Sequence, residues 1–471
     1  MLFNSWEFAL FLPCVLGCYY ILKTRAQNVL LLLSSYFFYS CWDWRFTGLL
    51  LLSTVVDYSV GRAIPQATAR RSRTLLLVSI CTNLGVLGLF KYFNFFADSA
   101  ADILGTFGIG ASPVLLNVIL PVGISFYTFQ TMAYTIDVYR GRVEPERDIV
   151  TFGIYVAFFP QLVAGPIERA QNLLPQIRAP RRIDQHQISS GTLLILIGLL
   201  RKVVIADNAA MYVDLVFSDP TAVSWTGLIK GIMYFSLQIY GDFAGYSNIA
   251  RGCSRLLGIE LMQNFNHPYF ATDITTFWRK WHISLSTWLR DYVYIPLGGN
   301  RGTVLFAYRN LILTMLLGGL WHGAGWTFVV WGGIHGVALA VHKWWLGGRD
   351  PQPMQWSSGI QGVLGALAGW LVTMAIVGFG WIFFRAPTFE AAYNVVMGIC
   401  TLSSGQQWIP HMPLFGMVLL LLAIDVPQSI AGEQTIWLRW GRARGLVYAF
   451  AVLLIVLLGS KENVPFIYFQ F

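Results

Sequence analysis

The chain has 471 residues, of which 56% are hydrophobic and only 12% are charged, whereas soluble domains carry about 25% charged residues. This composition excludes a soluble globular protein and a disordered chain, and it predicts a single polytopic membrane protein. The net charge of +9 comes from short basic clusters between apolar runs. We therefore expect those clusters to face anionic membrane lipid, and we expect no nucleic-acid partner.

Apolar runs follow one another along the whole sequence, and a straight span needs about 20 residues. We expect roughly 11 or 12 of them to cross the membrane as helices. The runs lie at 8–22, 28–41, 46–61, 74–90, 114–136, 149–163, 188–206, 224–245, 311–331, 332–346, 359–384, 413–425 and 444–459. The run at 149–163 contains Pro160 and has basic residues on both sides, so we expect it to be re-entrant or enclosed by protein.

The first run carries no basic residue ahead of it, and Lys23 and Arg25 follow it directly. A cleaved signal peptide would carry its positive charge before the run. We therefore predict a retained first span with its N-terminus on the periplasmic side. Loops rich in Lys and Arg then alternate with loops poor in them along the chain, which supports the same orientation.

The stretch 251–310 is the longest without a predicted span, and its centre is rich in Trp and Arg. We expect a helix there, capped by Thr275 or Thr276. Spacing puts Trp281, Leu285 and Trp288 on one face of this helix and Arg279, His282 and Ser286 on another. Two interpretations remain open. The segment is an interfacial helix with Trp anchors and snorkelling Arg side chains, which the pattern alone favours, or it lines a cytoplasmic entrance for a phosphate-bearing ligand.

A tight turn is expected at 294–301, where Pro296 precedes the pair Gly298 and Gly299. Its backbone N–H groups beside Arg301 would suit an anion. The simpler interpretation is a turn that returns the chain to the membrane.

His322 lies eleven residues into the apolar run that begins at Leu311. An ionisable residue inside a membrane span is costly and indicates a functional site. Glycines at 318, 319, 323 and 325 surround it, and they allow a neighbouring helix or a ligand to approach closely. The alternative is a neutral histidine that bonds across helices. His335 and His342 follow in the same region, 311–346, but no carboxylate completes a metal-binding pattern, so we expect no metal.

Asp242 lies near the end of another apolar run. It would either orient a catalytic group or bridge two helices, and the sequence favours the structural role. Nucleophile-elbow, zinc-protease, phosphate-loop and dinucleotide motifs are all missing from the sequence. The residues alone thus leave an enzyme and a transporter, with His322 as a proton relay, both open.

The sequence resembles the membrane-bound O-acyltransferase family, and within it the bacterial branch that acetylates polysaccharides such as alginate and cellulose. The stretches that carry the likeness are SFYTFQ (125–130), FFPQLVAGPI (158–167), YGDFAGYS (240–247), 277–301 and GLWHG (319–323). The likeness runs over nearly the whole chain, so we expect 1–471 to form one membrane acyltransferase domain.

The resemblance implies an all-α fold in which spanning, re-entrant and interfacial helices form a ring around a thin centre. It implies that His322 is the catalytic histidine and that His282 matches a second site, which holds His, Asn or Asp in different members. We expect no bound cofactor. The donor would be acetyl-CoA or another acyl thioester, reaching the site from the cytosol. The expected substrate-binding residues are Trp278, Arg279, Lys280, Trp281, Arg301, Asp242 and Trp321.

The same resemblance implies a bacterial inner-membrane enzyme that acts with periplasmic esterase-like transferases on an exported polysaccharide. D-alanyl transfer to teichoic acid, known in the same family, is the alternative acyl transfer.

Overall fold

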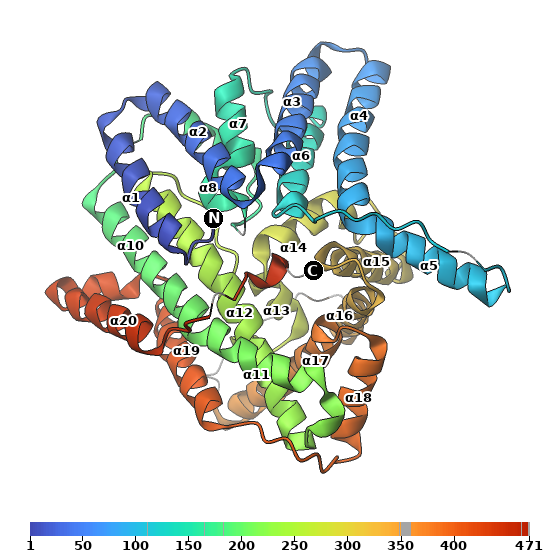
Figure 1. The fold of residues 1–471 in the computed structure, drawn as a ribbon. Coiled ribbons are helices and arrows are strands. Elements are labelled where there is room, and N and C mark those ends of the chain that lie inside the picture. Colours follow the sequence, from blue (N-terminus) through green and yellow to red (C-terminus); the bar gives the residue numbers. More distant parts are fainter. Residues whose placement is uncertain are drawn as a thin grey trace. The chain divides into compact units, whose positions relative to one another are not determined.

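A computed structural model describes residues 1–110, 112–163, 165–181, 183–347, 349, 359–462 and 464–469 of the chain. Ala164, which belongs to one of the stretches that carry the resemblance described above, lies outside these residues. The regular structure of the described residues is helical apart from two isolated β-bridges, and loops and turns connect the helices (Figure 1). The chain forms two compact units, one made of 1–192 and 250–262 and the other of 193–249 and 263–471.

Within the described part of the chain, the first unit contains twelve helical elements besides the parts of two helices that it shares with the second unit. They are α1 (Trp6–Ile21), α2 (Thr24–Asp43), η1 (Trp44–Phe46), α3 (Thr47–Ala63), η2 (Ile64–Gln66), α4 (Ala69–Leu87), η3 (Gly88–Tyr92), α5 (Phe93–Thr106), α6 (Ile124–Tyr139), α7 (Ile149–Ala157), α8 (Phe159–Leu162) and α9 (Ala170–Arg178). Two helices contribute to both units, namely α10 (Gln185–Leu199) and α12 (Trp225–Leu256).

The second unit contains the remaining helices. They are η4 (Leu200–Ala206), α11 (Asp207–Ser218), η5 (Pro220–Ala222), η6 (Pro268–Phe270), α13 (Ile274–Lys280), α14 (Ile283–Leu289), η7 (Arg290–Tyr294), α15 (Val304–His322), α16 (Trp326–Trp345), α17 (Gly359–Arg385), α18 (Phe389–Cys400), α19 (Met412–Ala431), η8 (Ile436–Ala443), α20 (Arg444–Leu458) and η9 (Ile467–Phe469).

Among the described residues, six helical stretches are long and apolar enough to cross a membrane, which is fewer than the 11 or 12 spans expected, and they confirm the prediction of an all-α polytopic membrane protein. They are 69–106, 185–218, 304–322, 359–385, 412–431 and 436–458. The run at 149–163 forms two short helices, α7 and α8, with a break at Phe158 and Pro160 in the first turn of α8. A straight crossing by this run would need about 20 helical residues, so its division agrees with the expectation of a re-entrant or enclosed segment.

Helices α3, α4 and α6 of the first unit are joined by a buried carboxylate. Asp57 on α3 accepts hydrogen bonds from Ser79 on α4 and from Thr135 on α6, the latter at 3.2 Å. Its second oxygen accepts from the Asn83 side chain at 2.8 Å. Polar bonds of this kind hold helices together where surrounding lipid is as apolar as the side chains. Asp57 is therefore a structural residue of this unit.

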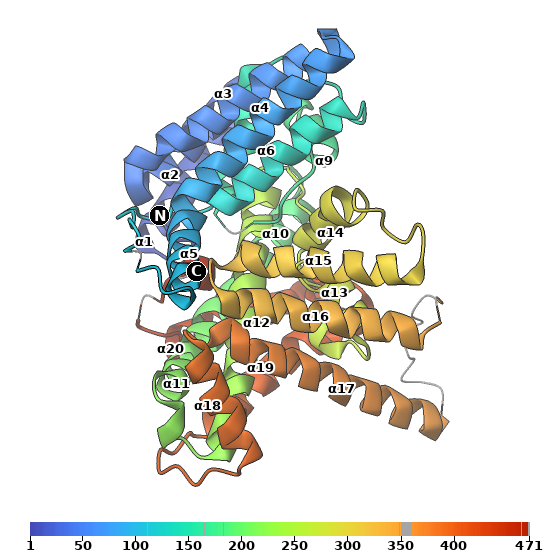
Figure 2. The ribbon, with the colours of Figure 1, turned by 90° about the vertical axis from the view of Figure 1, so that its right-hand side faces the viewer.

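Helices α15 and α16 form an antiparallel hairpin whose backbones touch (Figure 2). A methyl group added to Gly332 on α16 would collide with the carbonyl oxygen of Met315 on α15, and one added to Gly319 would collide with that of Phe328. Gly319 is one of the glycines predicted to permit close approach of a neighbouring helix, and it does so here. This contact fixes the end of α15, where His322 lies.

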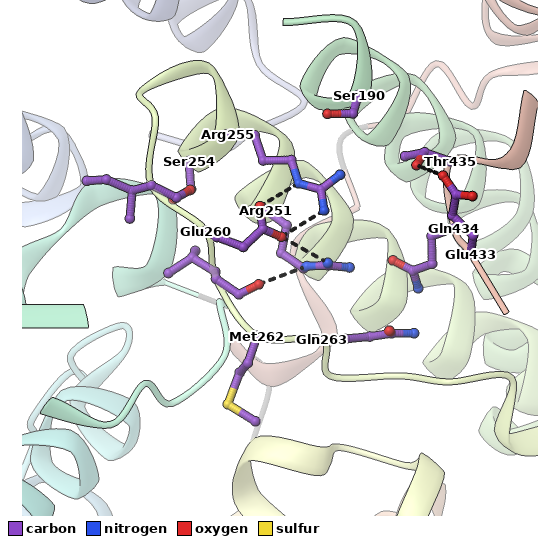
Figure 3. Close-up of polar contacts among 12 residues, drawn as sticks. Ser190, Arg251, Ser254, Arg255, Glu260, Met262, Gln263, Glu433, Gln434 and Thr435 are labelled. Carbon is purple, nitrogen blue, oxygen red and sulfur yellow. Dashed lines mark hydrogen bonds and ion pairs between the residues drawn. The ribbon is translucent and has the colours of Figure 1, made fainter. Parts of the chain in front are cut away.

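The end of α12 is tied to the loop that follows it in the first unit (Figure 3). Glu260 accepts from Arg255 at 2.7 Å and forms an ion pair with Arg251 at 3.4 Å. The Arg251 guanidinium also donates to the carbonyl oxygen of Leu261 at 3.2 Å. These two arginines belong to the basic segment 251–310, so part of its positive charge is balanced within the protein.

Candidate active site

His282 lies at a break between two short helices. Helix α13 starts after Asp273, whose carboxylate accepts from the backbone N–H and the hydroxyl of Thr276, each at 2.7 Å. The prediction that Thr275 or Thr276 caps this helix was therefore wrong by two or three positions. Asp273 is the better cap because its carboxylate reaches both donors of Thr276 at once.

The prediction that one continuous helix carries Trp281, Leu285 and Trp288 was also wrong. Trp281 is extended and His282 is left-handed, with φ of 42° and ψ of 55°, so α13 ends before them and α14 begins after them. Asn264 holds this break, since its carbonyl oxygen accepts from Ile283 N–H at 2.9 Å and its side chain accepts from Ser284 N–H at 3.2 Å. The break turns the His282 side chain into the interior, where it is fully buried.

His322 is the last residue of α15, and Gly323 after it is extended. It is 2% exposed. A side chain on Gly323 would run into the ring of Phe328, so the sharp exit of the chain from α15 depends on a glycine here. The helix thus ends with an imidazole that points into the packed interior.

The two histidines lie together in the second unit. Their ring centroids are 6.2 Å apart, and we call them the histidine pair. Trp321 contacts both, at 5.8 Å from His282 and 5.0 Å from His322. Trp331 and Phe384 lie against His322 at 5.0 and 5.4 Å. The pair is therefore enclosed by aromatic rings in a setting of low polarity.

Burial favours the uncharged form of the His282 imidazole. Loss of hydration lowers the pKa of His282 to about 3, so this ring is neutral at physiological pH. A neutral imidazole has one nitrogen that donates a hydrogen bond and one that accepts. Such a ring can take a proton from a hydroxyl group or donate a hydrogen bond to an oxygen that becomes negative.

Tyr468 completes this group and was missed by sequence reasoning. Its ring lies 5.4 Å from that of His322 and 6.3 Å from that of His282. The nearest sequence signal is the aromatic cluster Phe466, Tyr468 and Phe469, which follows the last apolar helix. The structure thus brings a phenol group to the histidine pair from a distant part of the chain.

The tryptophans predicted to bind substrate occupy different places. Trp321 belongs to the enclosure of the histidine pair. Trp278 lies one ring away, since it contacts Trp331 at 5.7 Å. Trp281 is buried and packs on Phe277 and Trp381, at 5.5 and 5.2 Å.

The basic residues predicted to bind substrate lie nearer the surface. Arg279 and Arg301 are exposed, so they do not join the buried histidine pair. Lys280 is half-buried, and this burial lowers the pKa of its ammonium group, which the nearby carboxylate of Asp273 opposes. The predicted turn is confirmed by the left-handed Gly298 and Gly299, and Arg301 N–H bonds back to the carbonyl oxygen of Gly298 at 2.9 Å.

Asp242 is buried in an ion group of the second unit. Its carboxylate pairs with Lys202 at 2.9 Å and accepts from Ile467 N–H at 2.7 Å. Lys202 also pairs with Asp207 at 2.7 Å. These contacts match the structural role that the sequence favoured, and a direct contact of Asp242 with substrate stays a prediction.

Comparisons with known proteins show which family and relatives this chain is similar to. A model of the membrane-bound O-acyltransferase family matches residues 146–381, which include both histidines. The chain is 38% identical to the "probable alginate O-acetylase AlgI" of Azotobacter vinelandii over the full length of both chains. It is 34% identical to the peptidoglycan O-acetyltransferase of Helicobacter pylori, over 100% of this chain and 98% of that one. Similarity to the teichoic acid D-alanyltransferase of Streptococcus thermophilus is 31% identity over 50% of this chain and 60% of the relative.

Proposed function

The chain belongs to the membrane-bound O-acyltransferase family, and we propose that it transfers an acetyl group from a thioester to, or towards, hydroxyl groups of an exported polysaccharide. The observation that carries this proposal is the buried pair His282 and His322 inside the matched region. The full-length relatives above are named as O-acetyltransferases of two polysaccharides, which supports acetyl as the acyl group.

In the proposed reaction His322 acts as a general base. Its neutral imidazole takes the proton of the acceptor hydroxyl while the hydroxyl oxygen attacks the thioester carbonyl. A carbon–oxygen bond forms and the carbon–sulfur bond breaks. The proton on His322 then passes to the leaving thiolate, so neither an acyl-histidine nor an oxidant is required. His282 donates a hydrogen bond to the carbonyl oxygen as negative charge develops there.

The thioester donor is acetyl-CoA or an acyl carrier with a phosphopantetheine arm. Arg279, Lys280 and Arg301 would bind its phosphate groups, because guanidinium and ammonium groups make strong charged hydrogen bonds with phosphate. The exposure of Arg279 and Arg301 supports this assignment, since a phosphate remains hydrated outside an aromatic interior. Trp278, Trp281 and Trp321 would line the path from there to the histidine pair.

The setting proposed for this activity is the bacterial inner membrane, with the N-terminus in the periplasm. Periplasmic esterase-like transferases would pass the acetyl group to the finished polymer. D-alanyl transfer to teichoic acid is less well supported, because the similarity to the named D-alanyltransferase covers half of the chain. The sequence alone left an enzyme and a transporter open. Because the chain belongs to an acyltransferase family, the enzyme is favoured.

The test is the amount of ester-linked acetyl on the secreted polysaccharide in cells that carry wild type, His322→Ala or His342→Gln, at equal membrane abundance. His342 is the matched control because it is a partly buried histidine that bonds Thr275 at 2.8 Å, outside the histidine pair. We expect His322→Ala to lose the acetyl while polymer yield stays constant, and His342→Gln to retain it. Acetylation by His322→Ala at the wild-type level would refute the proposal.

A further inference from the structure

The segment 464–469 enters the interior of the second unit after helix α20. Phe466 and Ile467 are 0% and 1% exposed, so the middle of this segment is part of the core. It belongs to η9 only at its end, from Ile467 to Phe469. A segment with so little regular structure of its own needs side-chain or tertiary bonds to keep one position.

Those bonds come from two neighbouring elements, η4 and α12. The Lys202 ammonium group on η4 donates to the carbonyl oxygen of Val464 at 3.0 Å. The Asp242 carboxylate on α12 accepts from Ile467 N–H at 2.7 Å. Just before the segment, Ser460 N–H donates to the carbonyl oxygen of Val203 at 2.9 Å. The segment is therefore held at Val464 by a lysine and at the buried Ile467 by an aspartate.

Lys202 and Asp242 are also bonded to each other, at 2.9 Å. Their side chains are 0% and 3% exposed. Removing one partner of a buried pair leaves a charge without compensation, and this is far more costly than the loss of a surface pair. The loss of either partner is therefore expected to disturb the segment that the pair binds. Asp207 adds a second carboxylate on the lysine, at 2.7 Å.

The other side of the same segment faces the histidine pair. Tyr468 lies 5.4 Å from His322 and 4.6 Å from Phe243, measured between ring centroids. Phe466 packs on Tyr246 at 4.5 Å. Ile467, which Asp242 binds, lies directly between Phe466 and Tyr468 in the chain. A shift of the backbone at Ile467 would therefore move Tyr468 directly.

We propose that Lys202 and Asp242 are positioning residues, which fix the 464–469 segment so that Tyr468 forms one wall of the histidine pair. Neither residue contacts the reacting groups in this assignment. Their effect on the rate acts through the position of the segment. The effect of Lys202 and Asp242 on the rate rests on the proposed acyl transfer, whereas their anchoring of the segment does not.

Amide hydrogen exchange of the purified full-length protein tests the anchoring without any assay of acyl transfer. We expect amides of the 464–469 segment to exchange at least about tenfold faster in Asp242→Ala than in wild type, because a hydrogen bond to an ionised acceptor is lost. Asp425→Asn is the matched control. Asp425 is a buried carboxylate of the same unit, and it binds Arg201 and the Tyr240 hydroxyl rather than the segment. We expect this variant to leave the exchange of 464–469 unchanged.

Unchanged exchange of 464–469 in Asp242→Ala would overturn the proposal. If that variant fails to fold, Asp242→Asn takes its place, because its amide keeps the size of the side chain and weakens the bond to Ile467 by removing the charge. We expect exchange a few-fold faster than wild type in that case, and wild-type exchange would again overturn the anchoring.

Acetyl transfer by the same variants tests the positioning role. We expect a lower kcat with an unchanged KM for the thioester donor, since the donor phosphates bind elsewhere. Lys202→Arg retains the positive charge, and we expect it to recover part of the rate that Lys202→Met loses. Faster exchange in the segment with a wild-type rate would overturn the positioning role. Acetylation by His322→Ala would instead overturn the proposed function and leave the exchange result intact.

Discussion

The indole N–H of Trp278 donates to Nδ1 of His335 across 3.4 Å and so joins α13 to α16. His335 is fully buried. Because its Nδ1 accepts a hydrogen, the neutral ring of His335 carries its proton on Nε2. Trp278, which the sequence assigned to substrate, therefore also has a structural contact one ring away from the histidine pair.

Replacing Trp278 by Phe should destabilise the protein through the loss of this bond. We expect the free energy of unfolding to fall by about 1 kcal/mol, measured by thermal unfolding in detergent. Trp344→Phe is the control, because Trp344 is exposed on the same helix as His335. Equal melting temperatures for the two variants would contradict the assigned hydrogen bond.

The burial of His282 predicts a dependence of stability on pH. The pKa of this ring is about 3 in the folded protein and roughly 6.5 in an unfolded chain. Between these values the unfolded chain binds a proton that the folded protein does not bind. The free energy of unfolding should therefore fall, by about 1.4 kcal/mol per pH unit from this group, as the pH drops below about 6.5.

The comparison with His282→Asn isolates this effect, because Asn accepts a left-handed backbone and does not titrate in this range. We expect wild type to lose more of its melting temperature than the variant between pH 7 and pH 5. Parallel curves for the two proteins would show that His282 takes up its proton without unfolding.

The backbone contact between α15 and α16 predicts opposite outcomes for two adjacent glycines. Gly332→Ala would place a methyl group on the carbonyl oxygen of Met315, whereas Gly333→Ala would meet only a side-chain carbon of Leu316 at 3.4 Å. Overpacking of this kind typically costs about 1–3 kcal/mol. We expect Gly332→Ala to lower the melting temperature and the membrane abundance and Gly333→Ala to change neither. Similar values for both would place the two helices farther apart.

The hydroxyl of Tyr468 can be tested apart from its ring. Tyr468→Phe keeps the contacts with Phe243 and the histidine pair, and we expect it to reduce acetylation at least about tenfold if the hydroxyl donates or accepts a proton there. Tyr269→Phe is the control, since the hydroxyl of this buried tyrosine donates to the carbonyl oxygen of Ser236. Full acetylation by Tyr468→Phe would limit Tyr468 to packing.

Composition and apolar runs were sufficient to predict an all-α membrane protein, because both follow directly from the cost of burying polar groups in lipid. The role of the glycines beside His322 was also predictable from the sequence, since close helix contact requires small residues. The assignment of His322 and His282 came from the resemblance to a family. The structure then showed that these two predicted residues are neighbours.

The break at His282 was not predictable from periodicity. Trp281, Leu285 and Trp288 have the spacing of one helix face, and all three are buried, yet the helix stops between the first two. A left-handed residue other than glycine is fixed by tertiary bonds, here those of Asn264, which lie outside the local pattern. The contact of Tyr468 with His322 was not predicted for the same reason, because no spacing along the chain links residues so far apart.

The position of the 464–469 segment in the order of synthesis has a consequence for biogenesis. It follows α20, so the ribosome has already released every helix that surrounds the histidine pair before this segment appears, and domains generally form in the order in which they are made. The histidine pair would thus remain open on this side until after α20 has been made. A nascent chain halted before Val464 would hold both histidines in the bilayer without the wall that Tyr468 supplies.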